Sequence, residues 1–216
     1  MDDDDQCFNW VDYPLELDGA TGGLLGNTPL ICGGWSFGQD IDECYSLNGV
    51  ASKFVTKMSV KRRWAASIVL NETILWITGG YGNGFLASSE YIRLAGSSPG
   101  PDLPMTLYAH AMIAINTTHS MVIGGQNYGY SIDLTFYFHH ANQQWIDGPR
   151  LIQARYDHAV GIVNDQVTMT NLVIVTGGYG GGYLDSTEIL VDSQWLPGKK
   201  SHIVPCFNKI NCMPLL

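Results

Sequence analysis

The chain has 216 residues, of which 45% are hydrophobic and 14% are charged, and its formal net charge at pH 7 is −9. This composition is typical of a single compact domain that buries a core. The acidic balance disfavours nucleic acid and anionic membrane surfaces as partners, because both require clustered Lys and Arg. No apolar run approaches the ~18 residues of a membrane span, so we expect no membrane insertion.

The amino-terminal residues 1–9 include four consecutive aspartates. A calcium site requires ligands spaced around a turn, so we interpret this run as an acidic disordered terminus. The segment also lacks the positively charged start and apolar core of a signal peptide. Trp10 follows, and with Pro14 and Leu15 behind it this residue has the pattern of the last strand of a preceding repeat.

Residues 10–198 contain four repeats, each marked by a glycine pair that closes a short apolar run rich in β-branched residues. The pairs are Gly33-Gly34, Gly79-Gly80, Gly124-Gly125 and Gly177-Gly178. Their spacing of roughly 45 to 53 residues is that of propeller blades. The last interval is longest because it contains extra polar residues, 165–170, and such loop insertions are tolerated. Residues 199–216 lose the pattern and are expected to form an irregular tail.

Each repeat is expected to form four short strands. The first strand is predicted over 64–70 and 108–115, the second over 74–78, 120–123 and 172–176, and the third over 86–94, 132–138 and 183–191. The fourth is centred on Phe54, Trp145 and Trp195. Val, Ile, Tyr, Phe and Trp favour strands, and Gly, Asn, Asp and Pro supply the turns between them. Because no stretch has helical periodicity with caps, the predicted fold class is all-β, with about four blades of four antiparallel strands.

Two of the five cysteines occupy recurring positions. Cys32 stands where two other repeats have Thr78 and Thr176 before the glycine pair, and Cys44 stands where the same two repeats have Glu90 and Glu188 after it. Since that Thr and Glu recur together, we expect them to be cross-strand neighbours, and we expect a disulfide between Cys32 and Cys44. Two separate buried thiols are the alternative, because Cys is a common small core residue.

The remaining cysteines leave their pairing open. Cys206 and Cys212 have the spacing for a second bridge in the tail, which leaves Cys7 over. No Cys-x-x-Cys lies near Cys32 or Cys44, so a metal site is disfavoured.

Two sequons also bear on location. Asn71-Glu72-Thr73 and Asn116-Thr117-Thr118 lie in predicted turns between the first and second strands, where a glycan projects into solvent. With the predicted disulfide they favour an extracellular protein, whereas the missing signal peptide favours the alternative, a cytoplasmic one.

Candidate chemistry is sparse. His110 and His158 recur at equivalent positions, and we expect them to be structural, with hydrogen bonds inside their own blade. His139 and His140 are adjacent on a strand and should face opposite sides. The basic run 61–63 is interpreted as a solvated turn between blades. No catalytic, cofactor or metal-binding residue is predicted, because no hydrolase, zinc-protease or phosphate-loop motif occurs.

The repeat as a whole resembles the kelch repeat. The resemblance is carried by Gly177-Gly178 with Trp195, and by the run Trp145, Gly148, Pro149, Arg150, Arg155, His158 and Ala159. It covers about residues 10–198, with departures at Phe54 in the first repeat and in the second, which has no Trp before Pro99. The cysteine-bearing repeat is similar to extracellular kelch-like proteins of invertebrates. Kelch propellers usually have six or seven blades, so we expect an incomplete propeller or a fragment with an unpaired sheet edge. A small ring is the alternative.

The predicted function is a scaffold that binds another protein through the loops after the glycine pairs. The contact candidates are Trp35, Phe37, Tyr81, Phe85, Tyr128, Tyr130, Tyr179 and Tyr183. Rigid aromatic anchors with Gly and Asn between them suit recognition. The alternatives are a sugar-acting propeller enzyme, a galactose-oxidase-like copper enzyme or a ubiquitin-ligase adaptor. The copper enzyme needs a Tyr–Cys crosslink, and Cys32 is better explained by Cys44.

Overall fold

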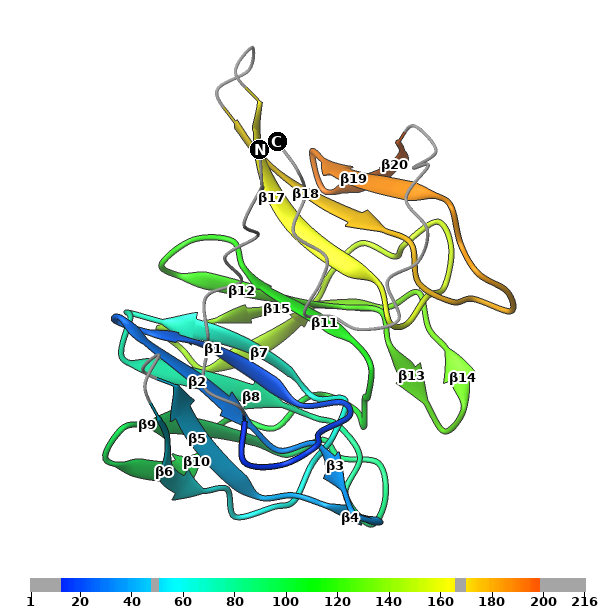
Figure 1. The fold of residues 1–216 in the computed structure, drawn as a ribbon. Helices are drawn as coiled ribbons and strands as arrows, with labels where there is room; N and C mark the ends of the chain where they lie inside the picture. The colour runs from blue at the N-terminus through cyan, green and yellow to red at the C-terminus, as the bar shows by residue number, and fades with distance from the viewer. Residues whose placement is uncertain (1–12, 48–50, 166–169, 199–216) are drawn as a thin grey trace, which may run out of the picture.

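The computed structural model describes residues 13–47, 51–165 and 170–198, and within these ranges the chain is all-β, without a helix (Figure 1). The all-β prediction is therefore confirmed. The expected acidic terminus (1–9), the tail (199–216), Trp10 and the three remaining cysteines lie outside the described residues.

Four antiparallel sheets of four strands follow one another along the chain. Sheet 1 contains β1 (Thr21–Leu25), β2 (Thr28–Cys32), β5 (Glu43–Leu47) and β6 (Ser52–Lys57), and sheet 2 contains β7 (Ala66–Leu70), β8 (Ile74–Thr78), β9 (Ser89–Arg93) and β10 (Gly96–Pro99). Sheet 3 contains β11 (Ala111–Ala114), β12 (His119–Ile123), β15 (Thr135–His139) and β16 (Gln144–Asp147), and sheet 4 contains β17 (Ala159–Asp165), β18 (Thr170–Thr176), β19 (Thr187–Val191) and β20 (Gln194–Pro197). Two small hairpins, β3 (Trp35–Ser36) with β4 (Gln39–Asp40) and β13 (Gln126–Asn127) with β14 (Tyr130–Ser131), follow the glycine pairs of sheets 1 and 3.

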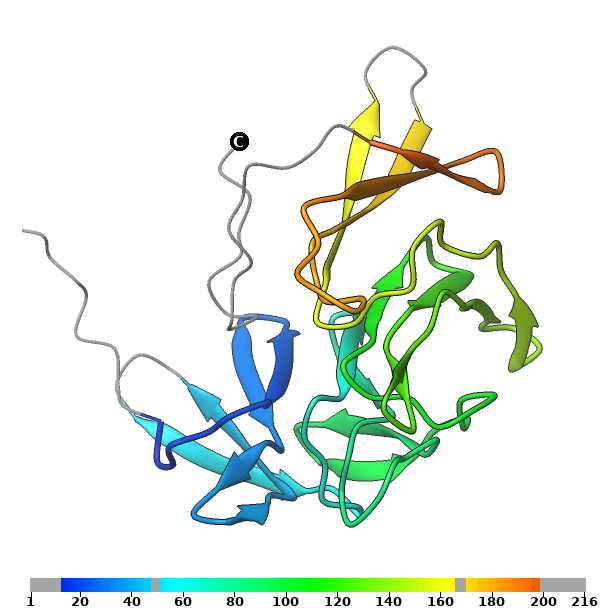
Figure 2. The ribbon, with the colours of Figure 1, turned by 90° about the vertical axis from the view of Figure 1, so that its right-hand side faces the viewer.

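The sheets lie side by side along an arc (Figure 2). Their first strands are neighbours in the order β1, β7, β11 and β17. A chain of backbone hydrogen bonds joins the turns before these strands: Trp64 N donates to Gly19 O (2.7 Å), Ala109 N to Trp64 O (2.8 Å) and Asp157 N to Ala109 O (2.9 Å). All four residues have positive φ, so this inner line of turns repeats one backbone conformation from sheet to sheet.

The core consists of three layers between successive sheets. Side chains one and three places before a glycine pair face the next sheet, whereas those two and four places before it face the preceding sheet. Leu30 and Cys32 of β2 accordingly pack against Leu75 and Ile77 of β8. Trp76 packs toward sheet 3, and Met121 and Ile123 of sheet 3 pack toward Val173 and Val175 of sheet 4. Each fully buried aliphatic side chain contributes about 1.5–3 kcal/mol to folding, so neighbouring sheets stabilise one another.

The predicted disulfide between Cys32 and Cys44 is present. The two residues are directly opposite on β2 and β5, with Cα atoms 4.1 Å apart, and both are buried toward sheet 2. The alignment that led to this prediction was wrong by one position. Thr78 and Thr176 pair with Ser89 and Thr187 respectively, not with the glutamates.

The misalignment has a structural cause in the loops after the glycine pairs. The first residue beyond the loop returns its N–H to the carbonyl of the second glycine, as in Ile41 to Gly34 and Leu86 to Gly80. The loops of sheets 1 and 3 are one residue longer than those of sheets 2 and 4. Glu90 and Glu188 therefore correspond in space to Tyr45 of sheet 1 and Phe136 of sheet 3.

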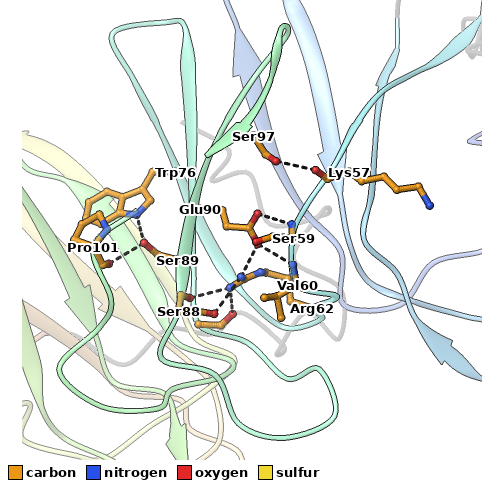
Figure 3. A network of polar contacts seen from close by, with 11 residues as sticks. Lys57, Ser59, Val60, Arg62, Trp76, Ser88, Ser89, Glu90, Ser97 and Pro101 are labelled. Atoms are coloured by element: carbon orange, nitrogen blue, oxygen red, sulfur yellow. Dashed lines mark hydrogen bonds and ion pairs between the residues drawn. The ribbon is translucent and has the colours of Figure 1, made fainter. Parts of the chain in front are cut away.

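The interpretation of the basic run 61–63 as a solvated turn was also wrong. Arg62 is 1% exposed, and its Nη1 donates to Gly79 O (2.8 Å) and Ser88 O (2.9 Å) while Nη2 donates to Glu90 Oε1 (2.9 Å) (Figure 3). Glu90 also accepts the N–H groups of Ser59 (2.7 Å) and Val60 (3.2 Å). Burial lowers the pKa of Arg62 from its ordinary value, and the carboxylate of Glu90 opposes that shift. We call this arrangement the Arg–Glu bridge.

Sheet 4 has the same bridge. Arg155 Nη2 donates to Glu188 Oε1 (2.8 Å) and Nη1 donates to Gly177 O (2.8 Å), while Glu188 accepts the N–H groups of Ile152 (2.7 Å) and Gln153 (3.0 Å). In both sheets a residue of the incoming connection is therefore fixed to the sheet that it leads into.

The histidine prediction needs one correction. His110 is buried and its Nε2 lies 2.9 Å from Oγ1 of Thr78, so the hydrogen bond joins sheets 2 and 3, not strands of one sheet. The residue is structural as expected, but it acts between sheets.

Candidate functional site

The loops after the four glycine pairs gather at one side of the molecule, where the small hairpins β3–β4 and β13–β14 project (Figure 1). Each loop is joined to the segment that opens a first strand by a two-residue antiparallel bridge. The bridged pairs are Asp18 with Trp35, Arg63 with Tyr81, Tyr108 with Gln126 and Tyr156 with Tyr179. We call the aromatic side chains of these loops and opening segments the aromatic rim.

The second glycine of each pair permits this close approach. Gly80 has φ 97°, and a Cβ there would lie 2.7 Å from the carbonyl oxygen of Arg63. Gly178 has φ 91°, and a Cβ there would lie 2.5 Å from the carbonyl oxygen of Tyr156. Both the backbone conformation and the available space therefore require glycine.

Two rim aromatics are held in an unfavourable backbone conformation at hairpin tips. Phe37-Gly38 and Tyr128-Gly129 are the central residues of two-residue turns with positive φ at both positions, 45° and 83° in the first and 44° and 87° in the second. Such type I′ turns favour Asn-Gly, and a bulky residue with positive φ is an outlier. Phe37 is nevertheless 82% exposed and Tyr128 65% exposed. The ring of Tyr128 contacts Phe85 (5.0 Å), but most of its surface, like that of Phe37, is open to solvent.

The loops of sheets 2 and 4 have a different form. Tyr81 bridges to Phe85 and Tyr179 bridges to Tyr183 across three-residue turns. In each loop the two rings meet edge to face, with centroids 5.4 Å and 5.5 Å apart. The first ring also packs inward, Tyr81 against Arg63 (5.0 Å) and Tyr179 against Tyr156 (5.4 Å).

Arg63 occupies the centre of the rim between sheets 1 and 2. Its guanidinium carbon lies 4.3 Å from the ring centroid of Trp35 and 4.6 Å from that of Trp64, and its Nη1 lies 3.4 Å from Oδ1 of Asp40. Cation–π contacts with three rings and an ion pair with one carboxylate hold this arginine in place. Trp35 and Tyr81 are thereby fixed on either side of it.

The aromatic contacts continue toward sheet 3. Phe85 packs against Tyr108 (5.3 Å) and against Tyr128 (5.0 Å), and Tyr108 also meets Trp64 (5.9 Å). The hydroxyl of Tyr108 donates to Oε1 of Gln126. Burial raises the pKa of Tyr108, so the phenol remains a neutral donor at physiological pH. The rim is therefore a continuous, pre-formed surface from Trp35 to Tyr128.

The eight predicted contact residues divide into two groups. Trp35, Tyr81, Phe85 and Tyr179 are half-buried and pack against the rim itself. Phe37, Tyr128, Tyr130 and Tyr183 are exposed, at 82%, 65%, 78% and 64%. Sequence reasoning missed Arg63, Trp64, Tyr108 and Tyr156. Their positions in the repeat could have identified them, because Arg63 and Tyr108 precede their glycine pairs by the same number of residues.

Other predicted features lie elsewhere. Asn71 and Asn116 are exposed in the turns β7–β8 and β11–β12, and Asn116 Oδ1 accepts the N–H (2.8 Å) and hydroxyl (2.8 Å) of Thr118. His139 faces His119 across the sheet (4.6 Å), whereas His140 packs on Trp76, so adjacent histidines do face opposite sides. Within the described ranges no three His, Cys, Asp or Glu residues form a metal-binding group, and no helix has the length and apolarity to cross a bilayer.

Comparisons with known proteins place the fold only. Neither a protein-family model nor a curated protein matches the sequence. A solved structure described as "Structure of YjhT" is similar, with a TM-score of 0.74 and 14% sequence identity over 86% of this chain and 71% of that chain. At this identity the likeness is one of fold.

Proposed function

We propose that the chain is a kelch-type β-propeller unit whose four sheets are blades. This assignment is supported by the four equivalent sheets in chain order and by their first strands, which lie side by side. A glycine pair also follows the second strand of each sheet. The missing Trp of the second repeat does not prevent its fourth strand from forming, because β10 pairs with β9 there.

We infer further that the protein binds another protein through the aromatic rim. One observation carries this proposal: Phe37 and Tyr128 are held exposed at hairpin tips in a conformation that disfavours them. Backbone strain of this kind persists where function requires it. The half-buried rings and Arg63 form a rigid base for these tips, and rigid aromatic anchors carry much of the energy of protein interfaces.

The disulfide supports an extracellular location for this binding unit, because disulfides persist in oxidising compartments. Asn71 and Asn116 are exposed in turns, so glycans on them would not disturb the sheets or the rim. Intact-mass analysis of secreted protein, before and after glycosidase treatment, tests both parts of this assignment.

The binding proposal is tested by alanine substitution of the four exposed rim residues, Phe37, Tyr128, Tyr130 and Tyr183. Proteins retained by immobilised wild-type chain are identified, and the affinity of the purified partner is then measured for each variant. We expect losses of about 2 kcal/mol or more at one or two of the positions. Leu94→Ala, at 53% exposure in the β9–β10 turn, is the control and should bind as wild type.

Circular dichroism and thermal melts establish that each variant is folded. Wild-type affinity in the combined four-residue variant, with the fold intact, would exclude the rim as the binding surface. Retention of a saccharide instead of a protein would favour the sugar-acting alternative.

A further inference from the structure

The two end sheets of the arc each present one apolar face that no described sheet covers. On sheet 1 this entry face is formed by Leu24, Pro29, Ile31, Tyr45 and Phe54. On sheet 4 the exit face is formed by Val163, Leu172, Ile174, Ile189 and Leu196. Leu24 is 54% exposed, Phe54 47%, Val163 49% and Leu196 45%. These are large apolar side chains in the middle or at the outer part of regular strands, not at loop tips.

The entry face corresponds to faces that are buried elsewhere in the molecule. Ile31 is two places before its glycine pair, as are Ile77, Val122 and Val175. Those three side chains are 0% exposed because the preceding sheet covers them. Ile31 has the same position and no preceding sheet, and it is only half-buried. Its face therefore has the chemistry of an internal sheet contact.

The exit face corresponds to faces that the next sheet covers elsewhere in the molecule. Ile174 is three places before its glycine pair, in the position of Leu30, Trp76 and Met121. Those three are 1% or less exposed, because the next sheet covers them. Ile174 is half-buried, and its cross-strand neighbours Gly161 and Ile189 belong to the same face. The molecule therefore carries both halves of its own repeated sheet–sheet interface, one at each end of the arc.

We propose that the exit face of one molecule packs on the entry face of a second copy of the same chain, in the way that successive sheets pack within the chain. An occupant of the exit face must present a face of the entry kind. Sheet 1 offers one that no described sheet covers, although the ring of Tyr13 contacts Tyr45 there (5.5 Å). An occupant of the entry face must present an exit face, and sheet 4 offers that one. The contact continues the three internal interfaces without requiring a new mode of packing.

This contact is head-to-tail, because the two surfaces that meet are different. Heterologous contacts generate closed rings when the rotation between copies closes and open chains of copies when it does not. Burial of large exposed aliphatic and aromatic groups on both sides provides the driving force. None of the four exposed rim residues belongs to either face, so self-association and binding through the rim are tested with separate variants.

The test uses one substitution in each face. Leu24→Glu places a charge in the entry face and leaves the exit face intact, whereas Leu196→Glu does the reverse. We expect the wild-type chain to associate with rising concentration in sedimentation velocity and light scattering. Each variant alone should be monomeric, and an equimolar mixture of the two should form a one-to-one dimer and nothing larger. Leu94→Glu, at 53% exposure in the turn of sheet 2, is the control and should associate as wild type.

The mixture is the decisive measurement. Only a head-to-tail contact can form between one variant that keeps its exit face and another that keeps its entry face. A wild-type chain that stays monomeric from low to high micromolar concentration would overturn the proposal. So would a wild-type assembly whose two variants fail to complement each other. Phe54→Glu and Val163→Glu provide a second pair of variants if circular dichroism shows that either of the first two is unfolded.

Discussion

Sheets 2 and 4 differ from sheet 3 in the way the incoming connection is fixed to the sheet. In sheets 2 and 4 a buried arginine of the connection is paired with a glutamate of the third strand, as in Arg62 with Glu90. In sheet 3 the corresponding residues are Leu107 and Phe136, which are both buried in the apolar layer between sheets 2 and 3. The same backbone arrangement is therefore stabilised by an ion pair in sheets 2 and 4 and by apolar packing in sheet 3.

The backbone of the connection changes together with this pair. Glu90 accepts the two N–H groups of Ser59 and Val60. In the connection to sheet 3, the residue in the place of Ser59 is Pro104, which has no N–H to satisfy. A glutamate is needed where the backbone N–H groups of the connection require an acceptor. It is dispensable where a proline leaves one N–H group fewer. The comparison shows that these positions act as a group, not one by one.

The largest expected effect comes from breaking one Arg–Glu bridge. Arg62→Leu leaves a buried carboxylate without its partner, and Glu90→Phe leaves a buried guanidinium, so each should lower the free energy of unfolding by about 3–5 kcal/mol. The double variant Arg62→Leu/Glu90→Phe reproduces the pair of sheet 3 and should lose less than either single variant, although the N–H groups of Ser59 and Val60 lose their acceptor. Urea denaturation followed by circular dichroism measures all three. Additive losses in the double variant would show that the two solutions are not interchangeable.

The second effect concerns sheet 1, which contains the disulfide where sheet 4 has the hydrogen-bonded pair Thr176 and Thr187 (3.0 Å). Cys32→Ala/Cys44→Ala should lower the free energy of unfolding by about 3 kcal/mol, because the crosslink no longer restricts the unfolded chain. Cys32→Thr/Cys44→Thr introduces the pair of sheet 4 and should recover a part of this loss. Denaturant midpoints with and without reductant give the comparison. Equal midpoints for wild type in both conditions would show that the crosslink contributes nothing.

A smaller effect on stability is expected at the type I′ turns, which occur in the loops of sheets 1 and 3 but not in those of sheets 2 and 4. Phe37→Asn and Tyr128→Asn place the favoured residue at the first position of each type I′ turn. Each should raise the free energy of unfolding by about 0.5–1 kcal/mol, while binding of the partner weakens. Tyr130→Asn is the control, since Tyr130 is 78% exposed but is not among the residues with positive φ. Loss of stability at the turn positions would contradict the assignment of strain.

The smallest effect is a pH dependence that comes from His140, which follows β15 of sheet 3. Burial, followed by the neighbouring His119 and His139, lowers the pKa of His140, whose Nε2 lies 2.9 Å from Oγ1 of Ser120. The unfolded chain therefore binds this proton more readily, so stability is greatest above the ordinary histidine pKa of about 6.5 and falls as the pH drops below it. His140→Gln should flatten the decline in denaturant midpoint between pH 7.5 and 5. An unchanged slope would assign the dependence to other groups.

The fold was predictable because its signal is repeated. Four glycine pairs and the strands before them gave the second strand of sheet 2 at its observed bounds, Ile74–Thr78. The third strands begin later than predicted, at Ser89, Thr135 and Thr187, because apolar residues such as Leu86 lie between the loop and the strand and pair with the connection to the next sheet. An apolar residue at a loop end has the same sequence appearance as one in a strand.

The site was predictable in outline only. Counting residues from the glycine pairs located the exposed tips Phe37 and Tyr128, but a count cannot detect that two loops are one residue longer than the others. Arg62 and Arg63 were misjudged for a different reason, since two adjacent arginines in a turn resemble a solvated charge run. Their partners, Glu90 and the ring of Trp35, are distant in sequence, and only the fold brings them together.

Arg62 belongs to two sheets at once. Its carbonyl oxygen accepts the N–H of Gly34 (2.8 Å) in sheet 1, while its guanidinium binds Gly79 and Glu90 in sheet 2. The boundary that the sequence suggests between these repeats is therefore a segment that both sheets share. New termini made at residues 61–63 would separate two sheets that depend on one buried residue, whereas the exposed turn 71–73 contacts sheet 1 through the hydrogen bond from Gly26 N to Glu72 O (2.7 Å) and contains no buried ion pair. The unit suitable for grafting or circular permutation accordingly begins and ends at that turn, within a sheet, and not at the junction of repeats.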